Sequence, residues 1–128
     1  MFILLVDDDF DDCELFAEIV EEIDRFSTVL CLHDGLEALA YLNSKGSPYP
    51  DMIFLDINMP RMNGKQLLLM LKDDERLKRI PIVIYSTSIP EKEMSYYHSF
   101  STTCLVKPST YHSLKEALSN IIIREVKI

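Results

Sequence analysis

The sequence has no long apolar segment and no excess of basic residues, and each absence excludes a class of function. No run of apolar residues approaches the length that a membrane-spanning helix needs. The first six residues carry no basic side chain and are too short for the apolar region of a signal peptide. The net charge of -8 argues against a nucleic-acid-binding surface, which would be basic. We therefore expect neither a membrane nor a nucleic acid as a direct partner.

Cysteine is also scarce, and its spacing excludes two kinds of structural site. The three cysteines, Cys13, Cys31 and Cys104, are odd in number, far apart and not arranged as CxxC. This pattern predicts neither a disulfide framework nor a zinc site. Free, buried thiols in a reducing compartment are the ordinary alternative, so we expect a cytoplasmic location.

The length and the pattern of the chain favour one folded domain. A chain of 128 residues buries about two-thirds of its unfolded surface, which is enough for one core. No internal repeat, low-complexity segment or interdomain linker interrupts the sequence. The last predicted helix runs nearly to residue 128, so we expect a single domain over residues 1–128 and no output domain.

The most informative stretch covers residues 51–64. Four apolar residues, 52–55, run directly into Asp56, which is typical of a strand buried on both faces. Pro60 and Gly64 then indicate a turn before the next helix. Asp56 is therefore expected at the carboxyl end of a buried strand, where open α/β sheets bind their ligands.

Strand and helix patterns alternate five times along the chain. Apolar runs predict strands at residues 2–6, 27–33, 52–55, 80–85 and 104–106. A helix is predicted after each strand, with Asp11 or Asp12 capping the first and Asp34 the second. The apolar residues of the second and third predicted helices are Leu36, Leu39, Ala40 and Leu42, and then Leu67, Leu68, Met70 and Leu71. Such alternation predicts a parallel sheet with helices on both faces and right-handed crossovers.

Polar residues stand at the ends of four predicted strands. They are Asp7 and Asp8, then Asp56, Ser86 and Lys107. Taken singly, these could be an acidic helix start, a loop hydroxyl and a surface lysine. Parallel strands, however, place all their carboxyl ends along one edge of the sheet. The shared position therefore favours a common site.

The residue types at this edge indicate a particular chemistry. Carboxylates crowded together need a cation, and a few carboxylates beside a phosphate suit Mg²⁺. A strand-end aspartate can act as a nucleophile and form an aspartyl phosphate. The amine of Lys107 would neutralise charge on the transferred phosphoryl group, and the hydroxyl of Ser86 could donate to it.

The constellation resembles the receiver domain of two-component response regulators, in particular stand-alone, chemotaxis-regulator-like members. The resemblance covers essentially the whole chain, and three segments carry it: residues 3–9 (ILLVDDD), residues 55–60 (LDINMP) with Gly64 and Ser86, and Lys107-Pro108. It implies a flavodoxin-like, doubly wound five-stranded parallel sheet of order 2-1-3-4-5 with five helices. It also implies phosphorelay signalling, with a domain that catalyses only its own phosphorylation and dephosphorylation.

The resemblance assigns a role to each residue of the site. Asp56 takes the place of the phosphoacceptor, supplied by a sensor histidine kinase or a histidine phosphotransfer protein. Asp8 is expected to bind Mg²⁺ directly and Asp7 partly through water, with Asp56 and the main-chain carbonyl of Asn58 completing the protein ligands. Ser86 and Lys107 are expected to contact the phosphoryl group. The downstream target would be a protein.

One departure from the family pattern concerns the switch. Cys104 stands three residues before Lys107, where the family usually has an aromatic residue. Tyr85 lies beside Ser86, but adjacent strand residues point to opposite faces, so we do not expect it to replace that aromatic ring.

Two alternatives differ in the chemistry they require. An aspartyl-phosphate phosphatase of the haloacid dehalogenase type needs an acid two residues after the nucleophile, and the amide of Asn58 cannot transfer a proton. A receiver-like binding module that is never phosphorylated would not need the intact site.

Overall fold

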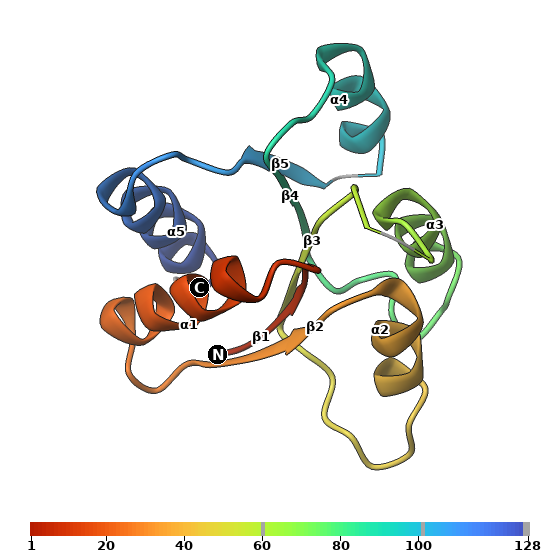
Figure 1. The fold of residues 1–128 in the computed structure, drawn as a ribbon. Coiled ribbons are helices and arrows are strands. Elements are labelled where there is room, and N and C mark those ends of the chain that lie inside the picture. The colour runs from red at the N-terminus through yellow and green to blue at the C-terminus, as the bar shows by residue number, and fades with distance from the viewer. Residues whose placement is uncertain (60, 101, 127–128) are drawn as a thin grey trace.

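The computed structural model describes residues 1–59, 61–100 and 102–126 and shows one parallel sheet with five helices (Figure 1). The turn predicted at Pro60 lies outside these residues. The strands are β1 (Phe2–Val6), β2 (Thr28–Leu32), β3 (Met52–Leu55), β4 (Ile82–Ser86) and β5 (Thr103–Val106). The helices are α1 (Phe10–Ile23), α2 (Gly35–Leu42), α3 (Gly64–Lys72), α4 (Glu91–His98) and α5 (Tyr111–Val126).

The strand order is β2-β1-β3-β4-β5, and every neighbouring pair is parallel. This confirms the predicted doubly wound sheet of order 2-1-3-4-5. Helices α1 and α5 cover one face of the sheet, and α2, α3 and α4 cover the other (Figure 1). Among the described helices, none combines the length and the apolar character that crossing a membrane would require.

The central strands β1, β3 and β4 are almost entirely apolar because both faces of the sheet are covered, and Ser86, at the end of β4, is the exception. In β1, Ile3 and Leu5 belong to the core beneath α1 and α5, whereas Leu4 and Val6 belong to the core beneath α2, α3 and α4. The alternation fixes the strand rotation, so the residues that follow each strand leave the sheet at a defined edge.

The start of α1 differs from the prediction. Asp9 is the N-cap, and its Oδ1 accepts a hydrogen bond from the N–H of Asp12 at 3.1 Å. The predicted caps, Asp11 and Asp12, lie instead within the first turn. Asp9, Asp11 and Asp12 can each cap a helix, and α1 begins after the first of these three. As a result, the side chain of Asp12 is free for another contact. Asp34 caps α2 as predicted, accepting from the N–H of Glu37 at 2.8 Å.

Three of the apolar residues on α2 and α3 lie outside the core. Leu36 and Met70 are nearly half exposed, and Ala40 is also exposed. The buried residues of these helices are Gly35, Ala38 and Leu42 on α2 and Gly64, Leu67, Leu68 and Leu71 on α3. Helices of two turns bury only a narrow stripe, and the angle at which they cross the sheet decides which residues fall within it.

Gly64 begins α3 directly against the site strand. A Cβ atom added to Gly64 would lie 2.3 Å from the main-chain oxygen of Asp56 and 2.6 Å from the Cα of Ile57. The sequence predicted a turn here, but the structural requirement is space rather than an unusual backbone angle. Asn63 caps the helix, and its side chain and that of Gln66 form a reciprocal capping box.

Candidate functional site

Three carboxylates meet at the carboxyl edge of the sheet. Asp7 and Asp8 follow β1 and Asp56 follows β3, and these strands are neighbours with Val6 opposite Leu55. One carboxylate oxygen from each of the three aspartates lies within 4.8 Å of the others. Asp7 and Asp56 are buried, whereas Asp8 is exposed. The cluster is therefore open to solvent on the side of Asp8.

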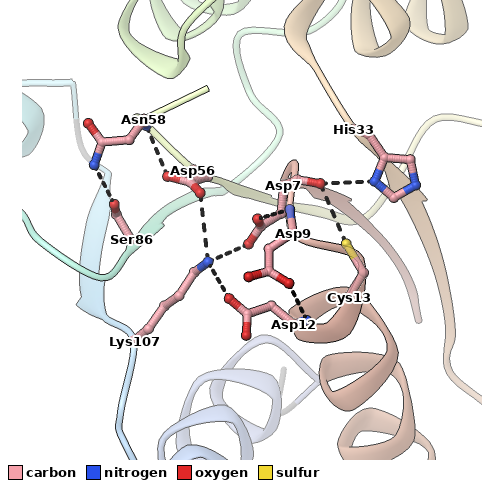
Figure 2. Close-up of polar contacts among 9 residues, drawn as sticks. All are labelled: Asp7, Asp9, Asp12, Cys13, His33, Asp56, Asn58, Ser86 and Lys107. Carbon is pink, nitrogen blue, oxygen red and sulfur yellow. Dashed lines mark hydrogen bonds and ion pairs between the residues drawn. The ribbon is translucent and has the colours of Figure 1, made fainter. Parts of the chain in front are cut away.

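Lys107 reaches this cluster from the end of β5. Its Nζ lies 2.6 Å from Asp7 Oδ2, 2.9 Å from Asp12 Oδ2 and 3.7 Å from Asp56 Oδ2 (Figure 2). The main-chain N–H of Lys107 donates to the carbonyl of Ser86 at 2.8 Å, which fixes the backbone at the neighbouring strand. The side chain passes the ring of Tyr85, with Nζ 5.2 Å from the ring centroid. This cation–π contact helps to hold an otherwise flexible amine.

Burial and charge oppose each other at this edge. Burial raises the pKa of Asp7, and the ion pair with Lys107 only partly offsets that increase. Burial by itself would lower the pKa of Lys107, but its bonds to Asp7 and Asp12 outweigh this effect and raise it. The lysine therefore stays charged while the carboxylates outnumber it. A divalent cation would balance the remaining negative charge.

The backbone of Asp7 is held by two side chains from other elements. His33 Nδ1 lies 3.0 Å from the carbonyl oxygen of Asp7, to which it donates, and Cys13 Sγ lies 3.6 Å from the same oxygen (Figure 2). The carboxylate of Asp7 also accepts from the N–H of Asp9 at 3.0 Å. These contacts orient the carboxylate before any ligand binds, which lowers the cost of ordering it.

Asn58 and Ser86 form the opposite side of the site. The N–H of Asn58 donates to Asp56 Oδ1 at 2.9 Å, and the Asn58 side chain donates to Ser86 Oγ at 3.0 Å (Figure 2). The sequence did not reveal this second bond, because it depends on how closely β3 and β4 lie. A hollow of about 260 Å³ adjoins Asn58 and Ser88, with Lys65 and Glu93 paired in its wall.

Cys104 lies on the face of the sheet that α2, α3 and α4 cover. Cys104 packs against the core beneath α2, α3 and α4, and the same core contains the fully buried ring of Tyr97 from α4. Tyr85 lies on the other face of the sheet, in edge-to-face contact with Phe16 and Phe54. Tyr85 and Cys104 therefore lie on opposite faces of the sheet, as the alternation of strand residues predicted.

The ligand set fits a hard divalent cation. All the candidate donors are oxygens, and three of them are carboxylates with solvent access through Asp8. Such a set suits a cation that keeps some of its waters and accepts a phosphate oxygen. Softer metals would favour the cysteines and histidines, and His33 and Cys13 here bond to the backbone of Asp7 instead.

The fold and this edge define a class: a doubly wound α/β domain with an acidic cluster and a lysine at the carboxyl ends of its strands. Residues 3–119 match the family described as response regulator receiver domain. The chain belongs to this family. The resemblance seen in the sequence is thereby confirmed, and the haloacid dehalogenase alternative is set aside.

Relatives and solved structures agree with the family. The chain is 34% identical to response regulator Rcp1 of Synechocystis sp., over 84% of this chain and 76% of the relative. It is 31% identical to the probable methanogenesis regulatory protein FilR2 of Methanothrix harundinacea, over 93% and 79% of the two chains. The phosphorylated cyanobacterial phytochrome response regulator RcpA superposes with a TM-score of 0.89 at 31% identity, covering 98% of this chain and 94% of that one.

A metal-bound relative bears on the acidic cluster. The Mn²⁺-bound form of Rcp1 superposes with a TM-score of 0.86 at 31% identity, covering 98% of this chain and 94% of that one. Family membership makes this chain a phosphorelay signalling domain that binds a divalent metal and works with a histidine kinase or phosphotransfer protein.

Proposed function

We propose that Asp56 accepts the phosphoryl group, with Mg²⁺ held by Asp7, Asp8, Asp56 and the main-chain carbonyl of Asn58. The observation that carries the proposal is the meeting of three carboxylates and one amine at the end of β3, with Lys107 Nζ 3.7 Å from Asp56 Oδ2. An acyl phosphate forming on Asp56 would lie between the cation and Lys107. Both would then neutralise charge on its oxygens.

In the transfer, a carboxylate oxygen of Asp56 attacks the phosphorus of a phosphohistidine. The new P–O bond forms as the P–N bond breaks, and the imidazole leaves with its electron pair. The N–H of Asn58 on Asp56 Oδ1 leaves Oδ2 as the oxygen that faces Lys107. When bound, the cation supplies charge neutralisation at the phosphoryl oxygens. The domain would thus catalyse its own phosphorylation and dephosphorylation and no other reaction.

Ser86 is suited to sense the new group. Its Oγ now accepts a hydrogen bond from Asn58, so its own proton remains free to be donated. A phosphoryl group adds about -1.5 to -2 charge and three strong acceptors, by analogy with phosphorylated hydroxyl residues. Movement of Ser86 toward these oxygens would draw in the loop before α4 and shift the population of a surface that a partner protein recognises.

The partner is a sensor histidine kinase or a histidine phosphotransfer protein, and the downstream target is a protein. A phytochrome-type kinase is the first partner to test, because relatives of 25 to 31% identity are described as response regulators of phytochromes or of red-light signalling. The three cysteines are free, which agrees with a reducing, cytoplasmic location.

The test is phosphorylation by acetyl phosphate in the presence of Mg²⁺, followed by intact-mass measurement. We expect one phosphoryl adduct on the wild type, none on Asp56→Ala, and none on the wild type when a chelator removes the metal. Asp73→Ala, which removes an exposed acid after the far end of α3, should be phosphorylated like the wild type. An equal adduct on Asp56→Ala would refute the assignment, and a wild type that takes no phosphoryl group would favour the non-phosphorylated binding module.

A further inference from the structure

Asp12 lies outside the motif residues of the site, yet it contacts one of them. We propose that Asp12 is a positioning residue that holds Lys107 when the metal occupies the acidic cluster, and so strengthens binding of the metal. This inference rests on the proposed function, because it assumes that Asp7 and Asp56 are ligands. Among the described residues, three carboxylates lie around Lys107 Nζ, those of Asp7, Asp12 and Asp56. Of these three, only Asp12 lies outside the cluster of Asp7, Asp8 and Asp56.

Lys107 and a divalent cation compete for the same groups. Two of the three carboxylates around Lys107 Nζ, those of Asp7 and Asp56, belong to the metal cluster. Two positive charges cannot share these oxygens closely, since like charges about 4 Å apart repel strongly at the dielectric of a partly buried site. A cation that takes Asp7 and Asp56 must therefore displace Lys107 or weaken its bonds.

Asp12 offers the displaced amine a place. Its Oδ2 lies 2.9 Å from Lys107 Nζ, at hydrogen-bonding distance, and it comes from α1 rather than from the edge of the sheet (Figure 2). The Asp12 side chain is 36% exposed, whereas that of Lys107 is 9% exposed. Lys107 can therefore keep one charged partner without leaving the site and without entering the metal cluster.

The local structure explains why Asp12 is available. Asp9 caps α1 and accepts the main-chain N–H of Asp12, so no cap occupies the Asp12 carboxylate. Asp11, its neighbour in the first turn, is exposed, and its side chain makes no hydrogen bond or ion pair within residues 1–59, 61–100 and 102–126. The two acids carry the same charge and lie on the same helix, but only Asp12 contacts Lys107. Asp11 is thus a matched control.

The experiment measures the Kd for Mg²⁺ by titration calorimetry on four single variants and one double variant. Asp12→Asn should raise the Kd about fivefold, the size expected for a partly exposed ion pair. Asp11→Asn should raise it less than about twofold, because it removes only a screened, more distant charge. Asp12→Glu, which keeps the carboxylate, should restore the Kd to within about twofold of the wild type.

A double-mutant cycle shows whether Asp12 acts through Lys107. Lys107→Met should lower the Kd, since it removes the competing charge. In the Lys107→Met background, Asp12→Asn should change the Kd no more than Asp11→Asn does in the wild type. Circular dichroism melts check that each variant is folded. An effect of Asp12→Asn that equals that of Asp11→Asn, or that persists unchanged beside Lys107→Met, would overturn the proposal.

The same samples separate this inference from the proposed function. A wild type that binds Mg²⁺ and forms the acetyl-phosphate adduct, together with an Asp12→Asn variant of unchanged Kd, would overturn the role of Asp12 alone. A wild type that binds no Mg²⁺ would overturn both.

Discussion

Replacing Gly64 with alanine tests how closely α3 must approach the site. The added Cβ would lie 2.3 Å from the main-chain oxygen of Asp56, 2.6 Å from Ile57 Cα and 2.9 Å from the main-chain carbon of Asp56. Ordinary contacts between such atoms are about 3.5 Å or longer, so the two segments must separate by about 1 Å. All three contacts are with backbone, so no side chain can rotate away.

The cost can be estimated from core overpacking. Forcing atoms into a packed region costs about 1–3 kcal/mol, and a rigid backbone obstacle places Gly64→Ala near the upper end. The unfolding entropy is about 2.1 cal/mol/K per residue, so for 128 residues each kcal/mol of lost stability lowers the melting temperature by about 4 °C. The melting temperature should therefore fall by about 10 °C. A shift of about 1 Å at the reacting group can cost about 100-fold in rate, so phosphorylation should slow strongly even well below the melting temperature.

Gly46→Ala is the control for the loss of a glycine. Gly46 has φ of 81°, so alanine there is strained, but its Cβ would meet no atom within 4 Å. We expect a loss of about 1 kcal/mol and an unchanged phosphorylation rate. Thermal melts followed by circular dichroism and intact-mass time courses with acetyl phosphate measure both quantities. A Gly64→Ala protein with the melting temperature and rate of the wild type would show that the close approach is not required.

Two further predictions concern stability. The hydroxyl of Tyr97 is buried and has no hydrogen-bond partner in the described part of the chain. Tyr97→Phe should therefore raise the free energy of unfolding, measured with urea, by about 1 kcal/mol, whereas Tyr96→Phe, at an exposed ring, should change it little. A lower free energy of unfolding for Tyr97→Phe would mean that the hydroxyl is paired. The N–H of Glu37, helped by Arg61, holds the pKa of Asp34 below its ordinary value. Because the folded pKa is lower than the unfolded value of about 3.9, this stabilisation is present above that pH and is lost as the pH falls through the folded pKa. Asp34→Asn keeps a cap that does not titrate, so its melting temperature should fall less between about pH 5 and pH 2; parallel melting curves would contradict the role of Asp34.

The sequence by itself determined the class of fold and the edge that carries the site. Strands buried on both faces are almost entirely apolar, so β1, β3 and β4 can be recognised in the sequence as short apolar runs. The first polar residue near the end of each strand marks where the chain leaves the core. Because the strands pair in parallel, these points all lie along the carboxyl edge of the sheet. Asp7, Asp56 and Lys107 could therefore be predicted as neighbours although 49 to 100 positions separate them in the chain.

The tertiary structure decided the contacts that have no period or motif. Asp12 reaches Lys107 only because the helix start falls at Asp9, one of several consecutive acids that could have capped it. The bond between Asn58 and Ser86 depends on how closely the ends of β3 and β4 lie, and the burial of Tyr97 depends on how a two-turn helix crosses the sheet. Periodicity fixes which element a residue belongs to. Distances of a few ångströms between side chains depend on how those elements pack, and no local pattern encodes them.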